Sequence, residues 1–194
     1  MSRFLFAAAL ALAATGSASA ATYKIDPRHT QVFFTYAHNE YSNLSGRLNE
    51  VDGTLEFDPA KPAASSISIE LPISSLSTGV PGLDTHMQSA DFFDMEKFPT
   101  ASFKSTKVSV KDATHFDLSG DLTIKGVTNS VTVPFDFEGA ATDPFGNLRV
   151  GFEGSVVINR KDYGITWNAA LETGGVLVSE KVKLEFDVSA IRNA

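Results

Sequence analysis

Histidine and carboxylate side chains are the groups in this sequence that could transfer protons or bind a metal ion. The histidines are His29, His38, His86 and His115. None has the paired spacing of a metal site, such as the two-histidine helical pattern of zinc proteases. Asp84 and Asp91 lie near His86, so one hypothesis is a hydrolase or isomerase that uses His86 with one of these acids. The simpler interpretation is that these side chains form hydrogen bonds at the ends of secondary-structure elements.

Two motifs of well-known enzyme classes are missing from the sequence. It contains no Gly-x-Ser-x-Gly elbow, which gives no support to acyl transfer by a serine nucleophile. It also contains no Gly-rich phosphate-binding loop of either standard type. We therefore expect a protein that is not an enzyme and that uses neither a metal ion nor a cofactor.

Other charged residues lie next to apolar ones, where they could contact a head group. Asp91 and Asp94 flank Phe92-Phe93, which could place an acid at the mouth of an apolar cavity or simply cap a helical turn. Arg160 follows a predicted strand and could meet an anionic head group. It could equally form an ion pair that steadies a loop.

The elements that must position these residues are predicted by alternation of apolar and polar side chains. Val182, Leu184, Phe186 and Val188 alternate with polar residues, as expected of a strand with one buried face. We predict a short strand near 23–25 and eight long strands at 30–38, 47–57, 66–73, 100–110, 114–125, 128–138, 147–158 and 178–188. Short polar turns such as Lys125-Gly126 join them, which indicates an antiparallel meander.

Two phase shifts favour a barrel over a flat sandwich. The apolar face changes between Ser105 and Val108, and again between Leu48 and Val51. Such shifts are typical of β-bulges, which are common where a sheet curls to close. Helical spacing between 81 and 97 predicts a short helical segment, and 159–175 reads as a long loop at a rim. The sequence therefore predicts an all-β fold, an eight-stranded antiparallel β-barrel with a short helical segment covering one end.

The composition indicates an exported single-domain protein. Residues 1–20 have a basic start, an apolar stretch and a small-x-small end at Ala18-Ser19-Ala20, the pattern of a secretory signal peptide. The expected mature domain is 21–194. The net charge of −7 argues against nucleic acid and against tight adsorption to anionic membranes. Because the chain has no cysteine, a disulfide framework is excluded.

Several ordered blocks of the sequence resemble one protein family. The blocks are Tyr23-x-Ile25-Asp26-Pro27-x-His29-Thr30, Gly46-Arg47, Phe57-Asp58, Asp84-x-His86-Met87-x-Ser89-x-Asp91-Phe92-Phe93-Asp94, Phe98-Pro99, Gly120-x-Leu122-Thr123-Ile124-Lys125-Gly126-Val127-Thr128 and Arg160-x-Asp162-Tyr163-Gly164. Together they resemble the YceI-like family of exported polyisoprenoid-binding proteins. Thr30 and Met87 stand where Ser and Leu are usual in the family. The Gly-x-Trp signature of true lipocalins is missing.

The resemblance implies a lipocalin-like barrel in the bacterial periplasm that holds a long isoprenoid or similar lipid. We predict binding of a polyprenyl diphosphate or a quinone tail, for sequestration, transport or storage. If the ligand is a quinone, a membrane electron-transfer partner is conceivable, and a homodimer is left open. An alternative is a filled barrel that acts as an interaction module through outward residues such as Phe33 and Val157.

The predicted ligand-binding residues fall into three groups. The inward residues of the strands are Val32, Phe34, Tyr36, Phe103, Phe116, Leu118, Leu122, Phe135, Phe137, Phe152, Val156, Leu184 and Phe186. The residues that shape the helical end are Leu83, Met87, Phe92 and Phe93. His38 and Arg160 are the predicted head-group contacts.

Overall fold

The computed structural model describes residues 20–172 and 174–193, so the predicted signal peptide lies outside them except for Ala20. The strands are β1 (Ala21–Ile25), β2 (Gln31–His38), β3 (Ser42–Leu48), β4 (Asp52–Phe57), β5 (Ser66–Pro72), β6 (Leu76–Ser77), β7 (Thr100–Val110), β8 (His115–Ile124), β9 (Val127–Thr142), β10 (Leu148–Asn159) and β11 (Val178–Arg192). The helices are the α-helix α1 (Pro81–Gln88) and the 3-10 turns η1 (Pro62–Ala64), η2 (Ile73–Ser75) and η3 (Arg160–Tyr163).

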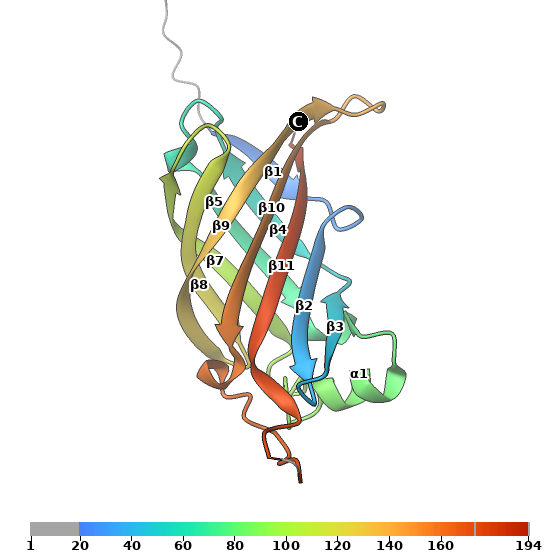
Figure 1. Ribbon diagram of the computed structural model, residues 1–194. Helices are drawn as coiled ribbons and strands as arrows, with labels where there is room; N and C mark the ends of the chain where they lie inside the picture. Colours follow the sequence, from blue (N-terminus) through green and yellow to red (C-terminus); the bar gives the residue numbers. More distant parts are fainter. Residues whose placement is uncertain (1–19, 173, 194) are drawn as a thin grey trace, which may run out of the picture.

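Eight strands form a closed antiparallel ring (Figure 1). Around the ring the order is β1-β4-β5-β7-β8-β9-β10-β11, and β1 closes it by pairing with β11. The predicted eight-stranded antiparallel barrel is therefore confirmed. The end that carries α1 is called the lower end, as in Figure 1, and the end that carries η1 is called the upper end.

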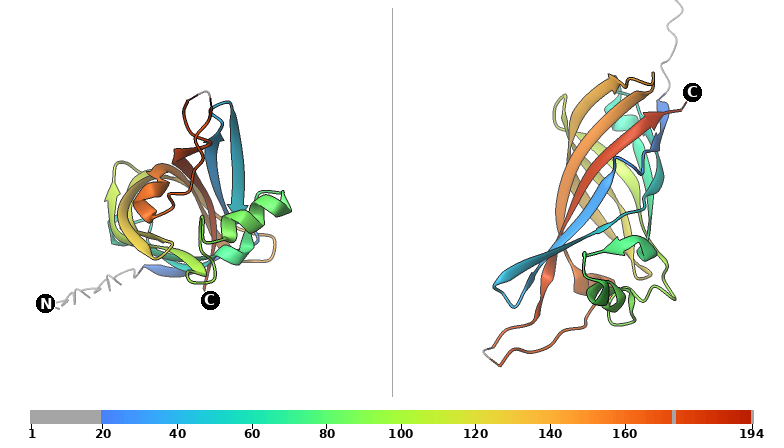
Figure 2. Two further views of the ribbon diagram at one scale, coloured as in Figure 1. Left: turned by 90° about the horizontal axis from the view of Figure 1, so that it is seen from below. Right: turned by 90° about the vertical axis from the view of Figure 1, so that its right-hand side faces the viewer.

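The strands β2, β3 and β6 extend the sheet away from the ring. Both β1 and β2 lie along β11: Lys24 pairs with Ile191, and Val32 pairs with Phe186. Between them the chain bends at Asp26, whose side chain accepts a hydrogen bond from the Arg28 amide at 3.0 Å. In Figure 2 the β2–β3 hairpin consequently leans outward from the lower half of the barrel.

The prediction of one strand over 47–57 is wrong, because β3 and β4 are separate. Leu48 pairs with Val32 and Leu76, whereas Leu55 pairs with Tyr23 and Ile67. The change of phase between Leu48 and Val51 therefore reflects a break in the strand, where the sheet divides into the ring and the hairpin. A bulge would have kept one continuous strand.

The other predicted phase shift, between Ser105 and Val108, is a bulge. The pairing of β7 with β8 shifts between Ser105 and Lys107, so one extra residue stands in β7. A similar irregularity lies between Gly151 and Phe152, opposite Gly139, whose φ of +133° favours glycine. Bulges increase the local twist and bend of a strand, and here they occur in long strands of the closed wall.

The lower end holds the irregular elements. Seen from below in Figure 2, η3 lies across the barrel, while α1 lies beside it, toward β2 and β3. The pairing of β6 with β3 explains this position, because the chain enters α1 from that side. The predicted helical segment is thus at one end of the barrel, but it lies beside the opening, and the chain around η3 covers more of it (Figure 2). No helix within 20–172 and 174–193 is long and apolar enough to cross a membrane.

Candidate functional site

The interior of the barrel contains three apolar cavities. The lower cavity has a volume of about 100 Å³, the middle cavity about 30 Å³ and the upper cavity about 60 Å³. Each has walls from several strands, since alternate residues of every strand point inward. Apart from Arg160 below and two serines above, their linings consist of apolar and aromatic residues.

Two layers of side chains separate the cavities. Four residues line both the lower and the middle cavity, namely Val32, Leu71, Leu122 and Phe186. Four others line both the middle and the upper cavity, namely Ile67, Leu118, Phe135 and Val188. No residue lines both the lower and the upper cavity. The cavities therefore follow one another along the barrel, with the layers as partitions.

Glycines in the wall leave room for phenylalanine rings to lie against it. A Cβ atom at Gly46 would overlap the ring of Phe34, its cross-strand partner. A Cβ at Gly154 would likewise lie 2.8 Å from the ring of Phe135, its partner across the β9–β10 pair. Rings held against the wall occupy less of the interior than rings pointing to its centre. This arrangement helps to explain why so aromatic an interior still contains space.

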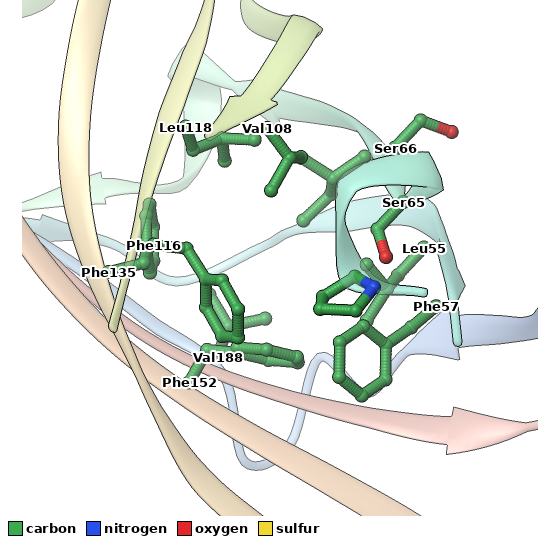
Figure 3. A pocket seen from close by; sticks show the side chains of 12 residues that line it. Leu55, Phe57, Ser65, Ser66, Val108, Phe116, Leu118, Phe135, Phe152 and Val188 are labelled. Carbon is green, nitrogen blue, oxygen red and sulfur yellow. The ribbon is translucent and has the colours of Figure 1, made fainter. Parts of the chain in front are cut away.

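The upper cavity is shown in Figure 3. Close to it, the rings of Phe57, Phe137 and Phe152 pack on one another with centroids 5.1–5.2 Å apart. Such tilted and edge-on pairs are the favoured arrangements of aromatic rings. In an otherwise apolar lining, the Ser65 Oγ atom is buried and has no hydrogen-bond partner within the described chain.

The lower cavity contains a buried cation. Arg160 is 4% exposed, and its guanidinium donates to the carbonyl oxygens of Ser179 (2.9 Å), Ile165 (2.8 Å), Trp167 (2.8 Å) and Val178 (3.2 Å). Burial lowers the pKa of this guanidinium below its ordinary value. Four of its five N–H groups are thus used to hold the main chain around η3.

An aromatic cluster closes the lower end. His86 packs edge-on against Phe92 and Trp167, with ring centroids 5.0 and 4.9 Å away. Its Nε2 atom lies 3.0 Å from an oxygen of Asp91. Asp84, in contrast, accepts hydrogen bonds from the Thr78 amide and hydroxyl, both at 2.6 Å. Of the two hypothetical partners, Asp91 is thus the one within hydrogen-bond distance of His86. The His86 ring also joins α1 to the loop after η3 through Trp167.

Most of the predicted ligand-binding residues line a cavity. Those in the lower cavity are Val32, Phe34, Tyr36, Met87, Phe92, Phe93, Leu122, Arg160, Leu184 and Phe186. Those in the middle or upper cavity are Phe103, Phe116, Leu118, Phe135, Phe152 and Val156. His38, Leu83 and Phe137 line none of the three. Whether any of these side chains contacts a ligand stays a prediction.

Sequence reasoning missed several lining residues. The alternation of Ile67, Ile69 and Leu71 was available in the predicted strand 66–73, and these side chains line the cavities just as the predicted phenylalanines do. Tyr163 and Ile165 belong to the irregular segment after β10, where no period indicates which side chains point inward. Ser65 likewise lies outside any alternating run.

Two of the remaining histidines, His29 and His115, form local pairs with acids. His29 Nδ1 lies 2.7 Å from Asp26, and His115 Nδ1 lies 2.7 Å from Asp112. In the part of the chain that the structure describes, no three His, Cys, Asp or Glu side chains are grouped so that they could hold a metal ion.

Similar sequences include two proteins from Pseudomonas. A UPF0312 protein of Pseudomonas savastanoi pv. phaseolicola is 42% identical over 157 residues, which cover 80% of this chain and 82% of the relative. A UPF0312 protein of Pseudomonas aeruginosa is 38% identical over 184 residues, covering 94% of this chain and 93% of the relative. The similarity therefore extends over at least 80% of this chain and of each relative.

Solved structures share the fold. Burkholderia cenocepacia BcnA matches with a TM-score of 0.75 and 22% identity, over 85% of this chain and 98% of that one. The Campylobacter jejuni YCEI protein matches with a TM-score of 0.70 and 26% identity, over 81% of this chain and 90% of that one. A polyisoprenoid binding domain from Saccharophagus degradans matches with a TM-score of 0.68 and 15% identity, over 88% of this chain and 98% of that one. The profile of the YceI-like domain matches residues 23–190. Both the sequence and the architecture thus show that this chain belongs to the family of proteins with a YceI-like domain.

Proposed function

We propose that the protein binds a long isoprenoid lipid inside its barrel. The observation that carries this proposal is the line of three apolar cavities through a phenylalanine-rich interior. Burial of apolar surface stabilises such a complex by about 25 cal/mol per Å². The polyisoprenoid binding domain of the Saccharophagus neighbour supports the ligand class only at the level of the shared fold.

The cellular role belongs to the same proposal. Export to the periplasm through residues 1–20, followed by sequestration, transport or storage of the lipid, agrees with the signal-like sequence of those residues. A polyprenyl diphosphate and a quinone tail are both long and apolar enough for the interior. A homodimer, or a membrane electron-transfer partner for a bound quinone, would be additions to this role.

The lipid must displace the partitions to span the barrel. The cavities are small and separated, so a long chain can occupy all three only if the side chains of the two layers rotate. Pre-formed pockets of drug-sized ligands usually measure about 300–1,000 Å³. We infer that binding of a long lipid widens the interior.

The test is native mass spectrometry of the protein purified from the periplasm of its source, followed by organic extraction. A discrete added mass that yields an isoprenoid on extraction is expected. A bare protein mass, without later uptake of polyprenyl lipids or quinones, would overturn the proposal and favour the filled barrel with a protein partner.

A matched pair of variants locates the lipid. Val156 lines the middle cavity, whereas Val157 is 58% exposed on the outer face of the same strand. Val156→Phe should reduce the bound lipid severalfold because the extra ring fills the middle of the path. Val157→Phe should leave the amount of bound lipid unchanged, and circular dichroism would check that both variants fold.

A further inference from the structure

The hydroxyl of Ser65 is a polar group on the wall of an otherwise apolar cavity. None of the 12 residues that line the upper cavity is charged, and Ser65 and Ser66 are its polar members. In Figure 3 the Ser65 oxygen is directed into the space beside Leu55 and Phe57, whereas the Ser66 oxygen points away from it. The Ser65 Oγ atom is buried without a hydrogen-bond partner in the described part of the chain.

Other serines at the ends of helical elements, Ser75 at the end of η2 and Ser89 after α1, use their hydroxyls locally. Ser75 donates to the Pro72 carbonyl oxygen and Ser89 to the His86 carbonyl oxygen, each at 2.7 Å. At the end of η1, the main chain of Ser65 makes the closing hydrogen bond, since its amide donates to the Pro62 carbonyl oxygen at 3.1 Å. Its side chain is therefore not needed for the turn, and its position on the cavity wall calls for another explanation.

A buried hydroxyl without a partner is unfavourable, and a ligand oxygen could provide one. The hydroxyl can donate to a carbonyl oxygen. A charged head group would find no opposite charge in this lining, and burying an unpaired charge is far more costly than burying a carbonyl. The chemistry of the upper cavity therefore favours a neutral oxygen acceptor.

We propose that the upper cavity binds the neutral carbonyl head of the lipid, with Ser65 as its hydrogen-bond donor. This inference rests on the proposed lipid binding and adds the class and orientation of the ligand. The tail then extends past Phe135 and Phe186 toward the lower cavity. At that end, Arg160 already donates to four carbonyl oxygens of the protein.

The test uses geranylgeranylacetone, an isoprenoid ketone, with a ¹³C-labelled carbonyl. Wild-type protein should bind it, and its carbonyl stretching frequency should fall on binding. Ser65→Ala should weaken binding about threefold to tenfold, as expected for one hydrogen bond, and should abolish the frequency shift. Ser65→Thr, which retains the hydroxyl, should restore the shift.

The controls separate this inference from the proposed function. Ser130→Ala removes a hydroxyl at an exposed position of β9 that lines none of the three cavities, and it should change neither affinity nor frequency. Ser65→Ala should leave the thermal midpoint of the lipid-free protein unchanged or higher, because it removes an unpartnered buried group. A lower midpoint would show a structural role for the hydroxyl, through a trapped water for example, and would overturn the inference.

Two further outcomes differ in what they contradict. If wild type and Ser65→Ala bind the ketone equally and with the same frequency, the head lies elsewhere and only this inference fails. Tighter binding of geranylgeranyl diphosphate than of the ketone would contradict the neutral head in the same way. If neither compound nor any longer isoprenoid binds, the proposed function itself fails.

Discussion

The rings of Phe135 and Phe186 pack on each other with centroids 6.0 Å apart and planes inclined by 32°. Phe186 belongs to the layer between the lower and middle cavities, and Phe135 belongs to the layer between the middle and upper cavities. The two partitions of the interior are therefore in direct contact. Movement of one ring changes the packing of the other, which couples the two ends of the lipid path.

This contact predicts a measurable coupling between the two rings. Phe135→Leu and Phe186→Leu should each lower the free energy of unfolding by about 1 kcal/mol. In the lipid-free protein, the loss of unfolding free energy in the double variant should be about 0.5–1.5 kcal/mol smaller than the sum of the losses in the two single variants. Urea unfolding of the four proteins measures this difference. With lipid bound, the coupling should fall, because the lipid separates the rings; an unchanged value would show that the partitions stay closed.

The glycine at position 46 should control the room in the lower cavity. Gly46→Ala places a methyl group against the Phe34 ring, which must then turn into the cavity, so lipid affinity should decrease severalfold. Phe34→Leu in the same protein should restore affinity. Gly82→Ala on α1 is the control, because its Cβ would meet no atom within 4 Å. Titration with a fluorescent isoprenoid measures all four proteins, and a failed rescue would disprove the steric explanation.

Replacing Arg160 should affect stability before it affects binding. Arg160→Met removes the donor to four main-chain carbonyl oxygens, of which that of Val178 still accepts a hydrogen bond from the Asn168 side-chain amide, and we expect a loss of about 3 kcal/mol or more in the free energy of unfolding. Arg28→Met, at an exposed position, should have little effect. If Arg160→Met unfolds like the wild type but no longer binds an anionic isoprenoid, the guanidinium is a head-group contact as the sequence predicted.

The Asp26 carboxylate should make stability depend on acid pH. Burial opposes its ionisation, but hydrogen bonds from Arg149 (2.6 Å), His29 (2.7 Å) and the Arg28 amide (3.0 Å) outweigh burial and lower its pKa from 3.8 to about 2. Because the folded-state pKa is the lower one, this contribution is present above pH 4 and is lost as the pH falls from 3.8 toward 2. Its size is about 2 kcal/mol.

Urea unfolding between pH 2.5 and 7 measures this contribution. Asp26→Asn should be less stable than the wild type at pH 7 and should lose about 2 kcal/mol less on acidification. Asp52→Asn, whose carboxylate is 77% exposed, should follow the wild-type curve. Parallel curves for Asp26→Asn and the wild type would show that Asp26 titrates normally.

Truncation of a side chain in the aromatic cluster of the lower end should expose Trp167 to solvent. Phe92 is 6% exposed and packs against Trp167, the chain's one tryptophan, with centroids 5.3 Å apart. Phe92→Ala should therefore increase quenching of the Trp167 fluorescence by acrylamide and lower the free energy of unfolding by about 3 kcal/mol. Phe145→Ala, at an 89% exposed position in the β9–β10 turn, should change neither quantity. Equal quenching in all three proteins would mean that Phe92 does not protect the indole.

Alternation predicted the wall of this barrel well because it reports directly on which side chains face inward. The same local signal located the bulge after Ser105. It could not distinguish a bulge from the break after Leu48, since that break depends on where β3 and β4 find their partners. Nor could it indicate Ser65, whose importance comes from the apolar residues that distant strands bring around it. The partitions were equally hidden, because they combine side chains from strands far apart in the sequence.

One consequence follows from the outward course of β2, β3 and β6. The Ile73 amide donates to the Pro99 carbonyl oxygen, just beyond the last paired residues of β5 and β7. From there on the chain leaves β7, and β6 pairs with β3 instead. The lower wall therefore has a gap in its β-pairing between β6 and β7, which the chain from 78 to 99 connects. Widening at this gap breaks no pairing of the β-sheet. We therefore expect the lower half of the barrel to yield more easily to a bulky ligand than the upper half, where β1 closes the ring by pairing with β11.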